Sequence, residues 1–349
     1  MKALTISALL FVVAAVDAHA QSFVIDLPLR SPAAVVSQRI GLTDIEIRYH
    51  RPQVNGRKIW GDLVPYGKVW RTGANTITTI RFSDPVTIDG HPLDAGTYGF
   101  HAIPTPAEWT LIFSKNSTTW GSFTYDQSED ALRVQVKPEP SPMHESMTFE
   151  VDHLQPDSAV VALEWENVRV PFRVGIDTHA IVQASLKQQL RGQKRYIWMS
   201  WDDAANYLLA EKLSPDDALA YANKSVELED RFDNEVTKSK ALAALNRPAD
   251  SELARRRAID LGTPTQLRDY GIDLLDKDRD LAFTVFRENA RKHPDAWQSH
   301  EGLARMYSAQ GKRTEALKEA HAALASAPES EKADLQAMEA RLSGYPGAH

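Results

Sequence analysis

The sequence contains no cysteine among its 349 residues. Without thiols the chain forms no disulfide bonds, and thiolate nucleophiles, zinc–thiolate sites and redox motifs are excluded. A basic excess is also missing, because the formal net charge is −7 at pH 7. Nucleic-acid binding requires a basic face. We therefore expect a protein that is stabilised by packing and has no nucleic-acid partner.

Long apolar runs are missing too, apart from one at the N-terminus. Lys2 precedes an almost unbroken apolar stretch from Ala3 to Val16, and Ala18-His19-Ala20 follows it. This stretch of about 14 residues is shorter than the ~20 that a membrane-spanning helix needs. A basic start, an apolar centre and a small-x-small end are typical of a signal peptide. We expect residues 1–20 to be removed and the mature chain to be exported, periplasmic or extracellular, without a membrane span.

The first half of the mature chain alternates between apolar and polar residues. A chain of this length favours two domains. In IEIRYHR, for example, Ile45, Ile47 and Tyr49 share one face. The segments WTLIFSK, LRVQV, MTFEVDHL and NVRVPFRV repeat this pattern and are separated by turn residues. Short alternating strands at this spacing predict an antiparallel β-sandwich or jelly roll over residues 21–176.

The second half has a helical pattern. The segment SPDDALAYANKSVEL begins with Ser214, a typical N-cap residue, and Pro215 suits the first helical position. Further helices are expected near residues 264–275, 281–292, 297–309 and 313–327. We therefore predict an all-α domain of helical hairpins over residues 177–345.

A spacing of 34 residues recurs in this half. It separates Ala282 from Ala316 and Pro294 from Pro328. The last unit resembles the tetratricopeptide repeat, and the positions expected to pack its two helices are Leu303, Tyr307, Gly311, Ala316, Ala323 and Pro328. A generic helical bundle is the alternative, since the earlier hairpins match the repeat poorly. Stacked hairpins offer a surface suited to a protein or peptide partner.

A longer resemblance covers the β half. The motifs SPAAVVSQRIGLTDIEIRYHRPQVNGRKIWGDLVPYGKVWRTGANTITTIRF, LDAGTYGFHAIP, EWTLIFSK, WGSFTYD and LRVQVKP lie between about Ser31 and Ile176. They are similar to the bacterial secreted family called domain of unknown function 2911 (DUF 2911). Members of that family also carry a helical repeat region downstream. The resemblance implies a fold and an exported location, but no reaction, substrate or catalytic residue.

The stretch GDLVPYGKVWRTGAN, residues 61–75, is the best candidate for ligand binding. Its three glycines and Pro65 indicate a tight loop. Arg71 can hold a carboxylate or sulfate through two parallel hydrogen bonds. In the structural alternative Arg71 pairs with Asp62 or Asp126 and fixes the loop. The candidate ligand-binding residues are His50, Arg51, Lys68, Trp70, Arg71, Asn75, Trp120, Tyr125 and Asp126.

Recognised catalytic and metal motifs are not found. The G-x-S-x-G elbow is missing, and Ser122 has no comparable context. His50, His91 and His101 lack the spacing of metal ligands, so no metal or other cofactor is expected. Glu164 and Glu166 share one strand face, and we expect both to be solvent-exposed.

These patterns predict an exported, non-enzymatic binding or scaffold protein. A glycan or small molecule would bind the β half, where loop tryptophans can stack on sugar rings. The helical half would bind a protein partner. The alternative is a hydrolase or other enzyme whose His50, Arg71, Asn75 and Asp126 meet in one cleft near the 61–75 loop.

Overall fold

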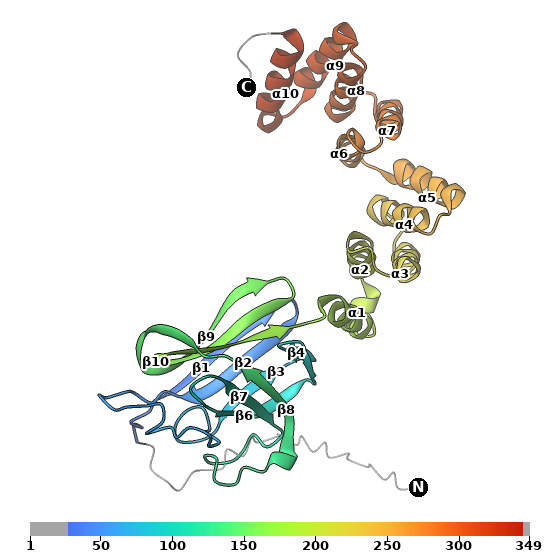
Figure 1. Ribbon diagram of the computed structural model, residues 1–349. Coiled ribbons are helices and arrows are strands. Elements are labelled where there is room, and N and C mark those ends of the chain that lie inside the picture. The colour runs from blue at the N-terminus through green and yellow to red at the C-terminus, as the bar shows by residue number, and fades with distance from the viewer. Residues whose placement is uncertain (1–26, 345–349) are drawn as a thin grey trace, which may run out of the picture. The chain divides into compact units, whose positions relative to one another are not determined.

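The computed structural model describes residues 27–344, so the expected signal peptide lies outside the described residues. The chain divides into two compact units, with the boundary between Ile181 and Val182. The first unit holds two antiparallel β-sheets, and the second is a series of helical hairpins (Figure 1). The predicted fold class, an all-β unit followed by a helical-hairpin unit, is confirmed.

The β unit consists of a six-stranded and a four-stranded sheet. The larger sheet has the order β1-β2-β3-β6-β7-β8, with bounds Ala33–Ile40, Thr43–His50, Thr78–Phe82, Gly96–Ile103, Trp109–Ser114 and Asp130–Val136. The smaller has the order β5-β4-β10-β9, with bounds His91–Leu93, Val86–Ile88, Ser158–Gly175 and Glu139–Gln155. A short 3₁₀ helix, η1 (Gln127–Glu129), leads into β8.

A single apolar core joins the two sheets. The alternation in β2 buries Ile45, Ile47 and Tyr49, as its sequence pattern predicts. From the opposite sheet, Phe149 of β9 meets the Tyr49 ring edge-on at a centroid distance of 4.9 Å. Inner faces that interdigitate in this way define a β-sandwich.

Four tryptophans pack together at one part of this core. Trp60, Trp70, Trp109 and Trp165 have ring centroids 4.8 to 6.4 Å apart where they meet. Trp109 is buried, as its alternation with Leu111 indicates. Aromatic pairs at these distances stabilise a core beyond their buried area alone. The cluster therefore anchors the loop that carries Trp60 and Trp70.

The long β9–β10 hairpin contains irregular pairing. The register shifts on both sides of Glu166, whose backbone has a φ of 55°. The expectation that Glu164 is solvent-exposed is wrong. Its side chain is buried, accepts a hydrogen bond of 2.9 Å from Nε of Arg169 and lies 2.9 Å from Nε2 of His144. A β-bulge interrupts the alternation on which the expectation was based.

The helical unit repeats with nearly constant spacing. Its helices are α1 (Thr178–Gln189, which crosses the unit boundary), α2 (Trp198–Ala210), α3 (Pro215–Leu228), α4 (Phe232–Ala244), α5 (Pro248–Leu261), α6 (Pro264–Leu274), α7 (Arg279–Lys292), α8 (Trp297–Ala309), α9 (Arg313–Ser326) and α10 (Glu329–Ser343), with a 3₁₀ turn, η2 (Gln193–Tyr196), before α2. From α2 onward, alternate helices begin 31 to 34 residues apart. The repeat therefore extends back to the hairpins whose sequences match it poorly.

Small residues allow the hairpins to pack closely. Phe286 of α7 is fully buried beside Gly271 of α6 and Gly302 of α8. A Cβ atom added at Gly271 would lie 2.3 Å from the Phe286 ring. In the last hairpin, Ala316 and Ala323 are fully buried. Leu303 and Tyr307 are partly buried and pack against the cluster of Ala282, Phe286 and Met306. Gly311 lies in a turn with positive φ, and Pro328 is the N-cap of α10.

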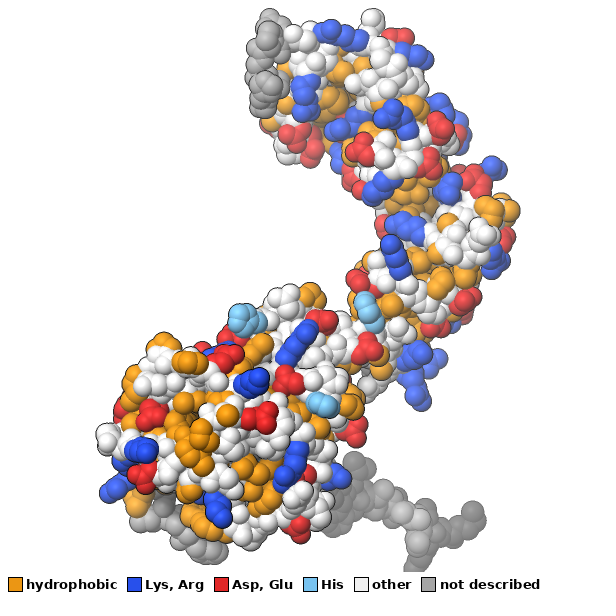
Figure 2. Space-filling view, viewed as in Figure 1, with side chains coloured by type: hydrophobic (Ala, Val, Ile, Leu, Met, Phe, Trp, Pro, Cys, Tyr) orange, Lys and Arg blue, Asp and Glu red, His pale blue; other side chains and the backbone are white. Residues whose placement is uncertain are grey.

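None of the helices within residues 27–344 is both long enough and apolar enough to cross a bilayer. On the face shown in Figure 2, basic and acidic side chains are intermixed over the helical unit, and neither sign forms a continuous patch there.

Candidate functional site

Arg71 is placed by a short backbone pairing. Trp70 exchanges two backbone hydrogen bonds, of 2.8 and 2.9 Å, with Ala102 of β6. The Trp70 side chain enters the tryptophan cluster of the core. Successive side chains of an extended segment point to opposite faces. Arg71 is therefore directed to the outer side of the six-stranded sheet.

Arg71 is a partly buried cation without an acidic partner among the described residues. No carboxylate of residues 27–344 lies within 4.0 Å of its guanidinium, and its Nε atom is buried without a hydrogen-bond acceptor there. Burial lowers the pKa of Arg71. The expected pairing of Arg71 with Asp62 or Asp126 is therefore wrong. The guanidinium is free to bind a carboxylate that belongs to a ligand.

The aromatic side of this site is open to solvent. The Arg71 guanidinium lies over the Trp120 ring, 5.8 Å from its centroid. Trp120 is 63% exposed and Phe123 is 80% exposed, and their rings are nearly parallel with centroids 6.1 Å apart. Large exposed aromatic surfaces on a soluble domain mark contact sites. We call Trp120 and Phe123 together the aromatic platform.

A cavity of about 380 Å³ lies on the outer side of strands β1 to β3. His50, at the end of β2, lines it, and the pKa of His50 is lowered by burial and by the nearby Arg71 charge. The Nδ1 atom of His50 lies 3.4 Å from Oγ1 of Thr76. The lining contains no acidic residue and several hydroxyl groups, those of Thr76, Thr79, Ser117, Thr118 and Thr119. The cavity thus offers hydrogen-bond donors and favours a negative or neutral ligand.

Two of the candidate residues bind backbone carbonyl groups. Arg51 donates from Nε to the carbonyl of Met147 at 2.9 Å, which joins the end of β2 to β9. Asn75 donates from Nδ2 to the carbonyl of Ser31 at 3.1 Å. Both side chains therefore hold loops in place beside the site. Lys68 is solvent-exposed.

Tyr125 and Asp126 take part in local hydrogen bonds. The Tyr125 hydroxyl donates to Oδ2 of Asp130 at 2.7 Å and accepts from Arg133. Asp126 caps η1 by accepting from the backbone N–H of Ser128 at 2.9 Å, and this lowers its pKa. Asp126 is thus used as a helix cap, while His50 and Arg71 are the pair that the structure brings together.

A buried histidine near this site was not among the candidate residues. His101 of β6 is only 2% exposed, and its Nδ1 atom lies 3.1 Å from Oγ of Ser122. Burial lowers the pKa of His101 to about 4, although Asp130 opposes this shift. Alternation along β6 places His101 on the face opposite to the core residues Phe100 and Ala102, so the sequence pattern does not indicate its burial. The loop that covers His101 was not predictable from periodicity.

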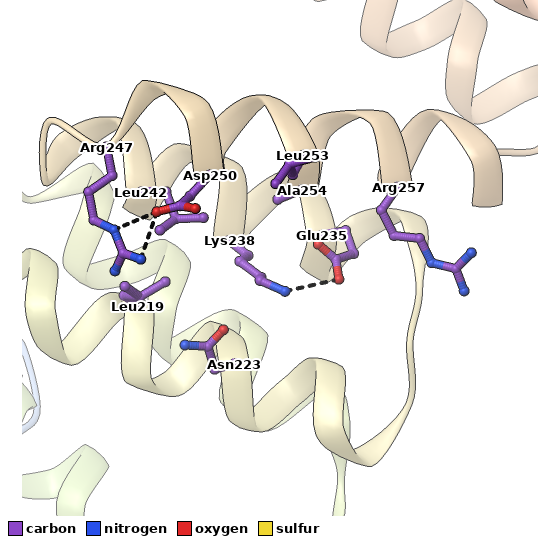
Figure 3. A pocket seen from close by; sticks show the side chains of 10 residues that line it. All are labelled: Leu219, Asn223, Glu235, Lys238, Leu242, Arg247, Asp250, Leu253, Ala254 and Arg257. Carbon is purple, nitrogen blue, oxygen red and sulfur yellow. Dashed lines mark hydrogen bonds and ion pairs between the residues drawn. The ribbon is translucent and has the colours of Figure 1, made fainter.

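Within residues 27–344, no group of three His, Asp or Glu side chains is placed to hold a metal ion. A second cavity, also about 380 Å³, lies in the helical unit between α3, α4 and α5 (Figure 3). It belongs to the other compact unit and shares no residue with the Arg71 site.

Comparison with known proteins finds one family that is similar to the β unit. Residues 31–174 match the family model described as Protein of unknown function (DUF2911). The β unit therefore resembles the DUF2911 family over most of its length. The match ends near the last residue of β10, so the helical unit lies outside it. No curated protein matches the chain.

Several solved structures resemble less than half of the chain. One is the APC/C hetero-tetramer Cut9–Hcn1, with 15% identity and a TM-score of 0.29, covering 46% of this chain and 32% of that one. Another is YrrB, described as a TPR protein with an unusual peptide-binding site, with 14% identity, a TM-score of 0.28 and coverages of 47% and 84%. A thermophilic TPR protein from Thermus thermophilus has 19% identity, a TM-score of 0.29 and coverages of 48% and 89%. The chain thus spans about a third of the Cut9–Hcn1 structure's chain and most of the other two.

Proposed function

We propose that this protein is an exported, non-enzymatic binding protein whose β unit holds an acidic glycan or a similar small anionic ligand. Arg71 carries this proposal. Its guanidinium is partly buried and has no acidic partner among the described residues. A cation in a low-dielectric site binds an anion more strongly than the same cation in water.

The surroundings of Arg71 favour a sugar acid over a simple anion. A carboxylate can accept two parallel hydrogen bonds from the guanidinium fork. The apolar face of the sugar ring can stack on the aromatic platform, and its hydroxyl groups can bond to the hydroxyl-lined cavity beside His50. The ligand would therefore be held by charge at one end and by stacking at the other.

The helical unit supplies the second part of the proposal. Stacked hairpins present long grooves between neighbouring helices, and such arrays bind protein segments. We propose that this unit docks a protein or peptide partner while the β unit holds its ligand. Export is proposed from residues 1–20, and an exported chain that begins at Gln21 on N-terminal sequencing would support it.

Isothermal titration of the mature protein with trigalacturonate, and with neutral trigalactose as the matched sugar, tests the binding site. Charge-assisted hydrogen bonds contribute about 1.5–3 kcal/mol, so Arg71→Ala should weaken trigalacturonate binding roughly 10- to 150-fold. Arg39→Ala is the control, because the Arg39 side chain on β1 is 62% exposed and is paired with Asp44 on β2. Equal binding by the wild type and Arg71→Ala, or equal binding of the two sugars, would contradict the proposal.

The contact between Ser122 and His101 favours a second candidate, a hydrolase at the same surface. Ser122 Oγ would attack an ester carbonyl and transfer its proton to Nδ1 of His101, 3.1 Å away. His101 would return this proton to the departing alcohol as the ester C–O bond breaks and the acyl-enzyme forms. Because burial lowers the pKa of His101 to about 4, this histidine is a weak base at neutral pH, and we rank the candidate second. A fluorophosphonate probe tests it. Covalent labelling of Ser122, seen by mass spectrometry and lost in His101→Gln, would establish the hydrolase.

A further inference from the structure

The cavity of the helical unit is a groove between two walls. Helix α4 forms its floor, while α3 supplies Leu219 and Asn223 from one side (Figure 3). The other side is α5 and the turn before it, which carries Arg247, Leu253 and Arg257. Its volume of about 380 Å³ is enough for one large side chain together with its backbone.

The charged groups at the groove are already paired with one another. Arg247 lies 2.7 Å from Asp250, and Arg257 lies 2.6 Å from Asp230. On the floor, Nζ of Lys238 donates to Oε1 of Glu235 at 3.2 Å. A charged ligand would have to break one of these ion pairs. Otherwise it would lie beside a pair that has no net charge and gain little attraction from it. The groove is therefore poorly suited to an acidic or a basic side chain.

Two polar groups keep unused hydrogen-bonding capacity. Glu235 is only 3% exposed, and its Oε2 atom is buried without a partner among the described residues. Asn223 faces the groove in Figure 3, and its amide makes no hydrogen bond within residues 27–344. Protein atoms cover that oxygen, so the Asn223 amide is the group at the groove that can bond to the backbone of a ligand.

Apolar side chains form the rest of the lining. Leu219, Leu242 and Ala254 line the groove, and Leu253 beside them is 65% exposed. Covering an exposed leucine with an apolar partner removes its surface from water and favours binding. The groove thus combines an apolar pocket with a donor and an acceptor for a peptide backbone.

We propose that this groove binds an extended, uncharged peptide segment with one apolar side chain at its centre. The side chain occupies the pocket between Leu219 and Leu253. The backbone of the segment pairs with the Asn223 amide, and no ion pair has to be broken. The inference rests on the proposed docking role of the helical unit, for which it specifies the site and the chemistry of the partner.

Fluorescence anisotropy with labelled nonapeptide pools tests this assignment on the mature full-length chain. One pool has Leu, Ile, Val or Met at the centre and uncharged flanks, and two matched pools have Lys or Arg, or Asp or Glu, at the centre. We expect the apolar pool to bind at least 10-fold more tightly than either charged pool. Leu253→Asp and Asn223→Ala should each weaken that binding at least 10-fold.

Leu228→Asp is the matched control, because Leu228 is also an exposed leucine on α3 but does not line the groove. Its binding should equal that of the wild type. Tighter binding of a charged pool, or full binding by Leu253→Asp and Asn223→Ala, would overturn the groove assignment and leave docking elsewhere on the helices intact. If none of the pools binds at millimolar concentration, both the groove and the peptide-docking role are wrong.

Discussion

His101 should make the stability of the β unit depend on pH. The side chain is almost fully buried on β6, and its Nδ1 atom is 3.1 Å from Oγ of Ser122. Burial lowers the pKa of His101 from the ordinary 6.5 to about 4 in the folded protein. Replacing it by glutamine keeps a polar group beside Ser122 and removes the titration.

The sign of the effect follows from proton binding in the two states. Between pH 6.5 and about 4, the unfolded chain binds a proton at His101 and the folded chain does not. The unfolded state is therefore favoured as the pH falls through this window, and the stabilisation is fully present only above it. One pKa unit corresponds to about 1.4 kcal/mol, so the depressed pKa accounts for about 3 kcal/mol of unfolding free energy between the two limits.

Urea unfolding of wild type and His101→Gln, followed by near-ultraviolet circular dichroism of the tryptophan cluster, measures this quantity. Carboxylates also titrate below pH 5, so the informative value is the difference in unfolding free energy between the two proteins at pH 7.5, 6.5, 5.5 and 4.5. The wild-type advantage should shrink by about 1.4 kcal/mol per pH unit below 6.5. A difference that stays constant across this range, or a His101 NMR titration near pH 6.5, would refute the reasoning.

Two further predictions apply one substitution to two arginines. Arg169→Met leaves the buried Glu164 without its 2.9 Å partner, so the unfolding free energy should fall by about 3–5 kcal/mol, measured by urea denaturation. Arg71→Met removes a partly buried cation that has no acidic partner among the described residues, so the urea midpoint should stay the same or rise while trigalacturonate binding is lost. A clear loss of stability in Arg71→Met would mean that Arg71 is a structural residue.

Local patterns in the sequence predicted most of the fold. The alternation at Ile45 and Ile47 describes a strand with one buried face, and this strand is β2. Ser214 caps α3 through its side chain, which accepts from the backbone N–H of Asp217, and Pro215 follows at the first helical position. These signals act within a few residues, so a single sequence is enough to read them.

The irregular features were not predictable in the same way. The bulge at Glu166 changes the face on which Glu164 lies, and no residue pattern records the register shift. Likewise, the 34-residue pattern weakens before α6, although α2 to α5 keep a similar spacing. There the packing between neighbouring helices depends on which side chains meet across hairpins, and different combinations of small and large residues satisfy it.

The contrast between Arg169 and Arg71 explains why the candidate site required a structure. Both arginines follow apolar residues in extended segments, and either is expected to pair with a nearby acid. Arg169 contacts three carboxylates, those of Glu139, Asp152 and Glu164. Arg71 contacts none among the described residues, and its neighbour is the Trp120 ring. Pairing depends on the loop that covers the sheet, which is a long-range property. Burial of an unpaired guanidinium opposes folding, and this cost is what the proposed anionic ligand would offset at Arg71.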